Sequence, residues 1–286
     1  MKRAFILGNP RSGTSLLRIM LNSHSAIAAP PESGFMQWWH EKYKDWQRND
    51  ASYESRVDEY ISDLNLSKKF ETWEVDVNQL KMYIQDHRPS NYGDLSEMVY
   101  RCWAIGNKKA PQAIVDKNNY YIAHIPELFT VWPDASIIHL VRDGRDVACS
   151  YLAMRDLNSS SPYLPQLPTA IDEIAEDWLT NNVLIEKFHE GNAAVPYIRV
   201  RYEDLLTDTK DILKTICAFL ELKYDSAMEL YYQTNAEPSS TLDWKRKTLN
   251  RPDSSNIGKH KETLTNVEVS IFNEVAGNML QHYRYL

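Results

Sequence analysis

Gly8-Asn9-Pro10-Arg11-Ser12-Gly13-Thr14-Ser15 is the most informative part of the sequence, because it joins an apolar run to a helical pattern. The run Ala4–Leu7 predicts a buried strand, and the apolar residues between Leu16 and Leu21 recur at helical spacing. In a strand–loop–helix unit, backbone N–H groups and the positive end of the helix dipole point at one anion. This segment therefore predicts an anion-binding loop in an α/β protein.

The loop departs from a nucleoside triphosphate loop in the position of its cation. Gly8 and Gly13 have the spacing of the pattern Gly-x-x-x-x-Gly-Lys-Ser/Thr, but Thr14 replaces the lysine and Arg11 lies inside the loop. That lysine serves terminal phosphates in such enzymes, whereas the planar fork of an arginine suits one terminal tetrahedral anion. The alternative is an ordinary strand–turn–helix corner with an unrelated arginine. The strand before the loop and the helix after it favour an anion site.

The rest of the chain repeats the alternation of strand and helix. Further apolar runs predict strands at 26–29, 113–115, 137–141 and 197–200, and helical patterns lie at 120–131, 145–154, 171–188 and from about Val267. This order predicts an α/β fold with a P-loop-type parallel β-sheet and helices on both faces. Residues 34 to about 110 contain helical patterns only, so we expect a helical insertion after the second strand. With no repeat or linker, residues 1–286 are predicted to form a single domain.

Composition limits the classes of partner. The chain has 286 residues and a formal net charge of −7, which favours neither nucleic acid nor an anionic membrane as a ligand. Cys102, Cys149 and Cys217 are widely spaced and form no Cys-x-x-Cys pair, so we expect neither disulfides nor a zinc site. No apolar stretch is long enough to span a bilayer or to serve as a signal peptide. A cytoplasmic protein is the simplest interpretation, with no indication of its oligomeric state.

A second basic segment follows the predicted strand at 137–141. Arg142 leaves that strand at the end where ligands of parallel sheets bind, and Ser150 lies in the helix that follows. Arg142 with its fork and Ser150 with its hydroxyl could bind one phosphate. The alternative is a charged helix start, with Asp143 as the cap and the arginines in solvent.

These segments together resemble the sulfotransferases that use 3′-phosphoadenosine 5′-phosphosulfate (PAPS). Gly8–Thr14 resembles their 5′-phosphosulfate loop, His139–Ser150 their 3′-phosphate motif, and Val200–Leu205 a third marker whose tyrosine lies near the nucleotide. The resemblance implies PAPS as donor, adenosine 3′,5′-bisphosphate (PAP) as product, and no requirement for a metal. It also implies that the donor is bound by Pro10, Arg11, Ser12, Gly13, Thr14, Ser15, Arg142, Ser150 and Tyr202.

The segment Ser254–Lys261 resembles the last nucleotide-binding loop of the same family. The resemblance implies donor contacts from Ser255, Gly258 and Lys259. His260 stands where the family pattern Gly-x-Trp-Lys has its tryptophan. The family's catalytic serine has four candidates here: Ser239, Ser240, Ser254 and Ser255.

Glu32 is the candidate general base. It directly follows the second predicted strand, at the sheet edge that holds the anion loop, where it could accept the proton of an acceptor hydroxyl. Its spacing from Arg11, and the place of Lys117 after the third strand, resemble tyrosylprotein sulfotransferases, which implies that Arg11 and Lys117 stabilise the transition state. His24 and His40 are alternative bases, because cytosolic-type members of the family use a histidine. The alternative for Glu32 itself is an exposed loop carboxylate.

Aromatic side chains recur at helical spacing just after Glu32. This stripe is typical of core packing, but it could also line a site for an aromatic acceptor. It consists of Phe35, Trp38, Trp39, Tyr43 and Trp46. The acceptor is expected to be a hydroxyl-bearing small molecule, a phenol or a tyrosyl peptide.

Two other functions fit part of the pattern. One is a magnesium-dependent P-loop kinase in which Asp143 holds the metal, and Thr14 in place of lysine argues against it. The other is a nucleotide-binding module without catalysis, against which Glu32 and Lys117 argue.

Overall fold

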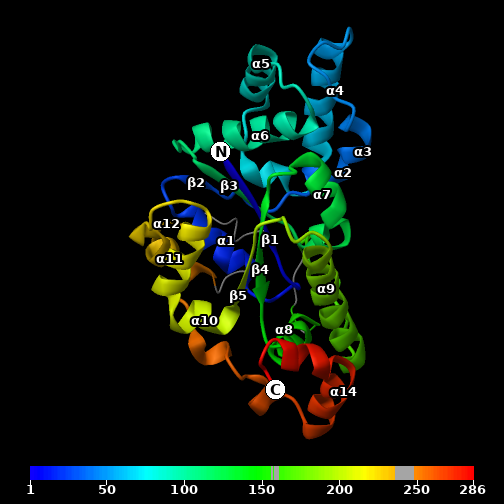
Figure 1. Cartoon of the computed structure of the whole chain (residues 1–286), viewed down its shortest axis with the longest axis vertical. Helices are drawn as coiled ribbons and strands as arrows, with labels where there is room; N and C mark the ends of the chain where they lie inside the picture. Colours follow the sequence, from blue (N-terminus) through cyan, green and yellow to red (C-terminus); the bar gives the residue numbers. More distant parts are fainter. Residues whose placement is uncertain (156, 158–160, 236–247) are drawn as a thin grey trace.

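The computed structural model describes residues 1–155, 157, 161–235 and 248–286. A parallel sheet crosses the molecule in the spatial order β2-β3-β1-β4-β5 (Figure 1). Its strands are β1 (Lys2–Leu7), β2 (Ile27–Ala28), β3 (Ala113–Lys117), β4 (Ser136–Val141) and β5 (Tyr197–Arg201). Ile6 is paired with both Lys117 and Ile138, so the carboxyl ends of β3, β1 and β4 meet at one edge. The predicted parallel sheet is confirmed.

The central strand β1 is apolar from Ala4 to Leu7 because both faces of this part are covered. Ala4 and Ile6 belong to one buried cluster, and Phe5 and Leu7 belong to another. The helices against the first face are α1 (Thr14–Asn22), α10 (Tyr202–Thr207), α11 (Thr209–Phe219) and α12 (Tyr231–Thr234), together with the 3₁₀ turn η3 (Ser226–Leu230). Those against the second face are α7 (Ile125–Val131), α8 (Gly144–Arg155), α9 (Ile171–Gly191) and α14 (Asn266–His282).

The predicted helical insertion lies between β2 and β3, above the sheet in Figure 1. It comprises α2 (Phe35–Trp38), α3 (His40–Tyr43), α4 (Tyr53–Leu66), η1 (Phe70–Trp73), α5 (Val77–His87) and α6 (Tyr92–Gly106). The side chains of Asp76 and Asn91 accept hydrogen bonds from backbone N–H groups at the starts of α5 and α6, which fixes where these helices begin. The insertion and the sheet share one apolar core, because Tyr100 of α6 packs with Phe5 of β1 in the same cluster.

The helical pattern predicted over 120–131 forms two helical elements rather than one continuous helix. The chain forms a 3₁₀ turn, η2 (Asn119–His124), and then α7. Pro126 lies in the first turn of α7. A longer helix would lose the N–H group of this proline and press its ring against the carbonyl of Ile122. The break therefore follows from the proline.

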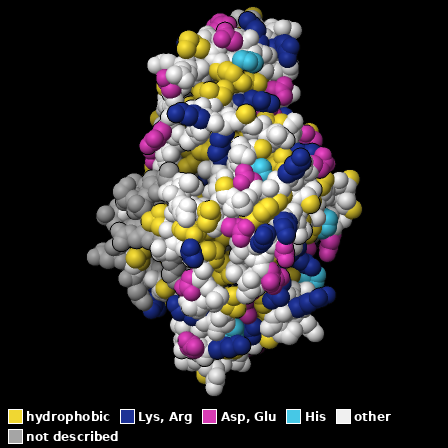
Figure 2. Space-filling model, turned by 90° about the vertical axis from the view of Figure 1, so that its left-hand side faces the viewer, with side chains coloured by type: hydrophobic (Ala, Val, Ile, Leu, Met, Phe, Trp, Pro, Cys, Tyr) yellow, Lys and Arg dark blue, Asp and Glu magenta, His cyan; other side chains and the backbone are white. Residues whose placement is uncertain are grey.

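The C-terminal part begins beyond residue 247 with η5 (Ser254–Asn256) and α13 (His260–Thr263). Helix α14 then starts one residue before the predicted Val267, because Thr265 and Glu268 form a capping box at its N-terminus. It packs along α9. None of the described helices combines the length and the apolar composition that a bilayer crossing needs. On the face shown in Figure 2, basic and acidic side chains are interspersed over the described residues.

Candidate active site

The loop Gly8–Gly13 connects β1 to α1, and there is no room for a side chain at either of its two glycines. Gly13 has φ 94°, and a Cβ atom there would lie 2.4 Å from a ring carbon of Tyr202. A Cβ atom on Gly8 would lie 2.4 Å from the carbonyl oxygen of Leu140. In the described chain no side chain caps the start of α1, so its first N–H groups remain available to an anion.

Arg11 and Arg142 lie together beside this loop. Arg142 Nη1 donates to the carbonyl of Arg11 at 3.1 Å, and Arg11 Nε donates to Ser150 Oγ at 3.1 Å. Burial, and then the neighbouring Arg142 guanidinium, lower the pKa of Arg11. Arg142 Nε and Ser12 Oγ are buried and have no hydrogen-bond partner among the described residues. A buried arginine with an unused donor beside a second, half-buried arginine is an environment that a bound anion would satisfy.

Tyr202 follows β5 and links the loop to Arg142. The guanidinium carbon of Arg142 lies 4.5 Å from the centre of the Tyr202 ring, within cation–π range. The same ring covers Gly13. Tyr202 therefore lies against both parts of the predicted donor site.

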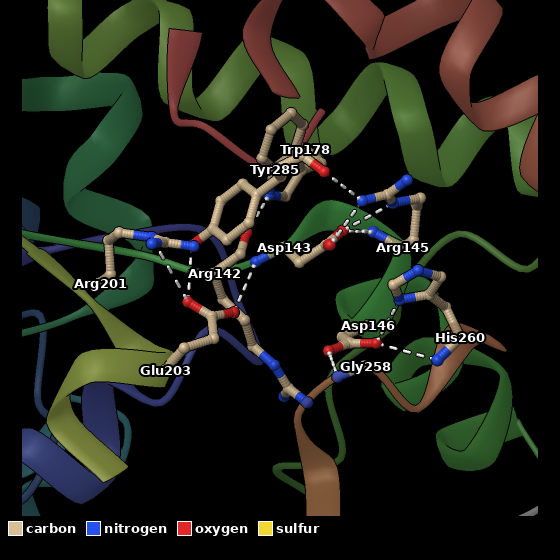
Figure 3. Close-up of polar contacts among 10 residues, drawn as sticks. All are labelled: Arg142, Asp143, Arg145, Asp146, Trp178, Arg201, Glu203, Gly258, His260 and Tyr285. Carbon is tan, nitrogen blue, oxygen red and sulfur yellow. Dashed lines mark hydrogen bonds and ion pairs between the residues drawn. The ribbon is translucent and has the colours of Figure 1, made fainter. Parts of the chain in front are cut away.

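A network of polar side chains supports the turn after β4 (Figure 3). Asp143 accepts hydrogen bonds from Arg145, Nε at 3.0 Å and Nη2 at 2.7 Å, and its own N–H donates to Glu203 Oε1 at 3.1 Å. Burial raises the pKa of Glu203. The Trp178 indole N–H donates to the carbonyl of Arg142 at 3.2 Å. Both oxygens of Asp143 are thus occupied by arginine, which does not suit the metal-holding role considered for a kinase. The described residues also contain no cluster of three metal-ligating side chains.

Asp146 holds the C-terminal segment against this turn (Figure 3). Its carboxylate accepts from the N–H groups of Gly258 and His260 at 2.7 and 2.9 Å, and from His260 Nδ1 at 2.7 Å. Burial raises the pKa of Asp146, but hydrogen bonds from His260 and Gly258 outweigh it and lower the pKa overall. In addition, Arg142 Nη2 donates to the carbonyl of Asn256 at 2.9 Å. The sequence singled out neither Asp146 nor His260 as an anchor.

These elements enclose a cavity of about 1130 Å³ at the carboxyl edge of the sheet. Predicted site residues that line it are Pro10, Arg11, Gly13, Thr14, Ser15, Glu32, Lys117, Arg142, Ser150, Tyr202 and Lys259. Three others lie outside this lining. Ser12 is a buried residue of the loop, the N–H of Gly258 (φ 71°) donates to Asp146, and the Ser255 hydroxyl donates to Asp253 at 2.6 Å. Of the other candidates for the catalytic serine, Ser254 is the first residue of η5. Ser239 and Ser240 lie outside the described residues.

Glu32 and Lys117 meet inside the cavity. Glu32 follows β2 and is 7% exposed, and Lys117 ends β3 and is 1% exposed. Lys117 Nζ donates to Glu32 Oε1, and Ser15 Oγ lies 3.5 Å from the same oxygen. Lys69 of the insertion donates to Glu32 Oε2 at 2.8 Å. Glu32 is therefore a buried, ion-paired carboxylate rather than an exposed loop residue, and Lys69 is a partner that the sequence did not reveal.

The two alternative histidine bases lie elsewhere. His24 hydrogen-bonds to the carbonyl of Lys223 and to the N–H of Ala26, and His40 contacts the Thr130 hydroxyl at 2.9 Å. Neither of them lines the cavity.

Most of the aromatic stripe after Glu32 is core. Phe35, Tyr43 and Trp46 are buried in the shared cluster, and Trp39 packs against that cluster. Only Trp38 of the stripe lines the cavity. Interpreting the whole stripe as a ligand wall is therefore wrong, because the insertion uses these rings to build its own interior. Tyr120 and Tyr163, which lay outside the stripe, also line the cavity, and the Tyr120 ring lies 6.1 Å from that of Trp38.

The sheet and the glycine-flanked loop define an α/β protein of the P-loop type. More specifically, the chain belongs to the sulfotransferase family, whose model matches residues 3–226. Mouse (Mus musculus) Sulfotransferase 1B1 is 30% identical over 126 residues, which cover 41% of this chain and 40% of that protein. Protein-tyrosine sulfotransferase 1 of Danio rerio is 23% identical over 235 residues, covering 80% of this chain and 55% of that protein. The matched region thus spans about half the length of these relatives or less.

Solved structures show the same fold. The sulfotransferase domain from the curacin biosynthetic pathway superimposes with a TM-score of 0.63, covering 97% of both chains at 22% identity. The sulfotransferase domain from the olefin synthase of Synechococcus PCC 7002 has a TM-score of 0.59 at 22% identity and covers 96% of this chain and 94% of that chain. The predicted α/β class and the predicted family are confirmed.

Proposed function

We propose that this protein transfers a sulfuryl group from PAPS to an acceptor hydroxyl. The observation that carries the proposal is the pair of Arg11 and Arg142, which lie side by side in the cavity lining, with the buried donor Arg142 Nε unpartnered among the described residues. PAPS has two separated anionic ends, at the 5′ and 3′ positions. The anion loop with Arg11 would bind the 5′ end, and Arg142 with Ser150 would bind the 3′-phosphate.

In the proposed reaction, a bond forms between the acceptor oxygen and sulfur while the bond from sulfur to the bridging oxygen breaks. Glu32 would accept the acceptor proton, because it is a buried carboxylate in the cavity lining and lies beside Ser15 at the start of α1. Lys117 and Arg11 would balance the charge that develops on the leaving 5′-phosphate. These cations could supply the electrostatic role of a metal, so we propose that none is required.

The lining beside Glu32 supports an aromatic acceptor. The rings of Trp38 and Tyr120 lie 6.1 Å apart, and the Tyr163 ring lies 5.9 Å from Nζ of Lys69, which binds Glu32. Flat aromatic walls beside a buried base suit a phenol, either free or in a tyrosyl peptide. Since Cys102, Cys149 and Cys217 are all free thiols, we further propose a reducing compartment such as the cytoplasm.

Incubation with sulfur-labelled PAPS and a panel of phenols, tyrosyl peptides, alcohols and glycans tests the proposal. Mass spectrometry should detect a sulfated phenol and an equal amount of PAP. The R142A variant is the matched control and should need far more donor for the same rate. Transfer of phosphate from ATP and magnesium, without sulfuryl transfer, would overturn the proposal in favour of a kinase. Tight binding of PAP without turnover on any acceptor would favour a non-catalytic module.

A further inference from the structure

Glu32 is held by two ammonium groups that come from different parts of the fold. Lys117 ends β3 and binds Oε1, whereas Lys69 precedes η1 in the insertion and binds Oε2 at 2.8 Å. The side chains of Glu32, Lys117 and Lys69 are 8%, 1% and 17% exposed. We call these three residues the ion triad.

The backbone around Lys69 is built for this contact. Lys69 has φ 66°, a left-handed conformation that is strained for a side-chain-bearing residue. The turn is fixed by the Phe70 N–H, which donates to the carbonyl of Ser67, and by the Thr72 hydroxyl, which donates to the carbonyl of Lys69. The Nζ atom also lies 5.9 Å from the centre of the Tyr163 ring. Strain held in this way at a cavity is typical of a functional position.

We propose that Lys69 is a positioning residue that holds Glu32 when Lys117 turns to the donor, so that donor binding and base placement are coupled. This inference rests on the proposed function. In the structure Lys117 is paired with Glu32, yet the proposed reaction needs its charge at the leaving phosphate. A buried carboxylate left without a counter-charge would be strongly destabilised. Because Lys69 binds the other oxygen, Lys117 can leave while Glu32 keeps a counter-charge and an oxygen for the acceptor proton.

The other charged groups near Glu32 do not serve this purpose. Arg11 interacts with Glu32 through its charge, but it belongs to the anion loop, where its Nε donates to Ser150. Asp116 repels Glu32 and is bound by the hydroxyls of Tyr100 and Tyr121. In contrast, Lys68 is exposed, lines the same cavity and makes no ion pair among the described residues. It is therefore a matched control for removal of one positive charge.

Titration calorimetry with PAP tests the coupling. In K69M, Glu32 loses the ammonium group on Oε2 and should hold Lys117 more strongly against the nucleotide, so PAP affinity should fall roughly tenfold. The effect should vanish in the E32Q background, where no carboxylate competes. K69R should retain most of the wild-type affinity, and K68M should match the wild type. Melting curves of each variant show whether it is folded.

The pH profile of kcat/KM for a phenolic acceptor gives a second readout. Loss of the charge 2.8 Å from Glu32 makes that carboxylate easier to protonate, so the acid limb in K69M should move to higher pH by roughly one unit. The limb should stay in place in K68M.

The possible results separate the two proposals. Equal losses of PAP affinity in K69M and K68M, or a loss in K69M that persists with E32Q, would overturn the role of Lys69. If the wild type transfers sulfuryl groups and K69M has the same pH profile of kcat/KM as the wild type, only this inference is overturned. Preference of the wild type for ATP and magnesium over PAP would overturn the proposed function and this inference with it.

Discussion

Gly13 and Tyr202 are in such close contact that no side chain fits between them. A Cβ atom on Gly13 would lie 2.4 Å from Cδ2 and 2.7 Å from Cε2 of the ring. The guanidinium group of Arg142 also packs against the Tyr202 ring. The anion loop, the residue after β5 and the residue after β4 are therefore packed as one unit.

The first prediction concerns this contact. Gly13→Ala should lower the free energy of unfolding by at least about 1–2 kcal/mol, because its φ of 94° is left-handed, and the clash with Tyr202 adds to this loss. In a Tyr202→Ala background the clash is absent and only the conformational part should remain. Urea unfolding of the wild type, Gly13→Ala, Tyr202→Ala and the double variant measures the conformational loss and the loss due to the clash separately. Equal losses in the two backgrounds would contradict the contact, and no loss at all would contradict the loop conformation.

The second prediction separates the two ends of the donor. Arg142→Ala should weaken PAPS by about 1.5–3 kcal/mol and adenosine 5′-phosphosulfate far less, because only PAPS carries a 3′-phosphate. Arg251→Ala removes another arginine from the lining of the same cavity and should not discriminate in this way. Competition binding measures the affinities of both nucleotides for each variant and for the wild type. Equal losses for the two nucleotides in Arg142→Ala would assign Arg142 a structural role.

The third prediction tests the base. Glu32→Gln keeps the shape of the side chain and removes its ability to take a proton, so turnover should fall by roughly 10²–10⁴-fold. Donor affinity should stay within a small factor. Glu74→Gln, the same change at an exposed carboxylate in the helical insertion, should leave turnover intact. Near-normal turnover in Glu32→Gln would return His24 and His40 as candidates, and loss of nucleotide binding would indicate a structural role.

The fourth prediction follows from two buried groups whose proton affinities are shifted in opposite directions. Burial lowers the pKa of His139 from 6.5 to about 4, and burial raises the pKa of Asp116 from 3.8 to about 6. The stability due to His139 is complete above pH 6.5 and is lost as the pH falls towards 4. The stability due to Asp116 is complete below pH 3.8 and is lost as the pH rises through 6. Between pH 4 and 6 the two effects cancel.

Asp116→Asn should remove this cancellation. The hydroxyls of Tyr100 and Tyr121, which lie 2.6 and 2.5 Å from Asp116 Oδ2, can still donate to the amide oxygen. The free energy of unfolding should then rise by about 1.4 kcal/mol per pH unit more steeply than in the wild type between pH 4 and 6. Urea unfolding at several pH values measures the two slopes. Parallel slopes would show that Asp116 is ionised in the folded protein at these pH values.

The parts of the molecule that depend on local pattern were predictable. Apolar runs identified each strand of the sheet, and the loop between β1 and α1 was recognisable from Gly8, Gly13 and the flanking elements. Glu32 and Lys117 were also predicted as candidates, because each follows a strand and the carboxyl ends of parallel strands meet at one edge.

Contacts between distant segments were not predictable in this way. Lys69 reaches Glu32 across 37 residues from the insertion, whose helical patterns do not say how it packs on the sheet. Asp146 binds His260 across 114 residues, and the local sequence around neither residue indicates this contact. The aromatic stripe was ambiguous for a related reason. Helical spacing marks a face that is covered, but a core and a ligand can cover it equally well.

The sheet order has a consequence for synthesis of the protein on the ribosome. β1 is made first and becomes the central strand, but both its neighbours, β3 and β4, come much later in the chain, with Lys2 paired to Ala113 and Ala4 to Ser136. At about 5–20 residues per second, the nascent β1 waits roughly 5–20 seconds for its first hydrogen-bonded neighbour. During that interval an apolar strand with two open edges is available to chaperones and to other nascent chains.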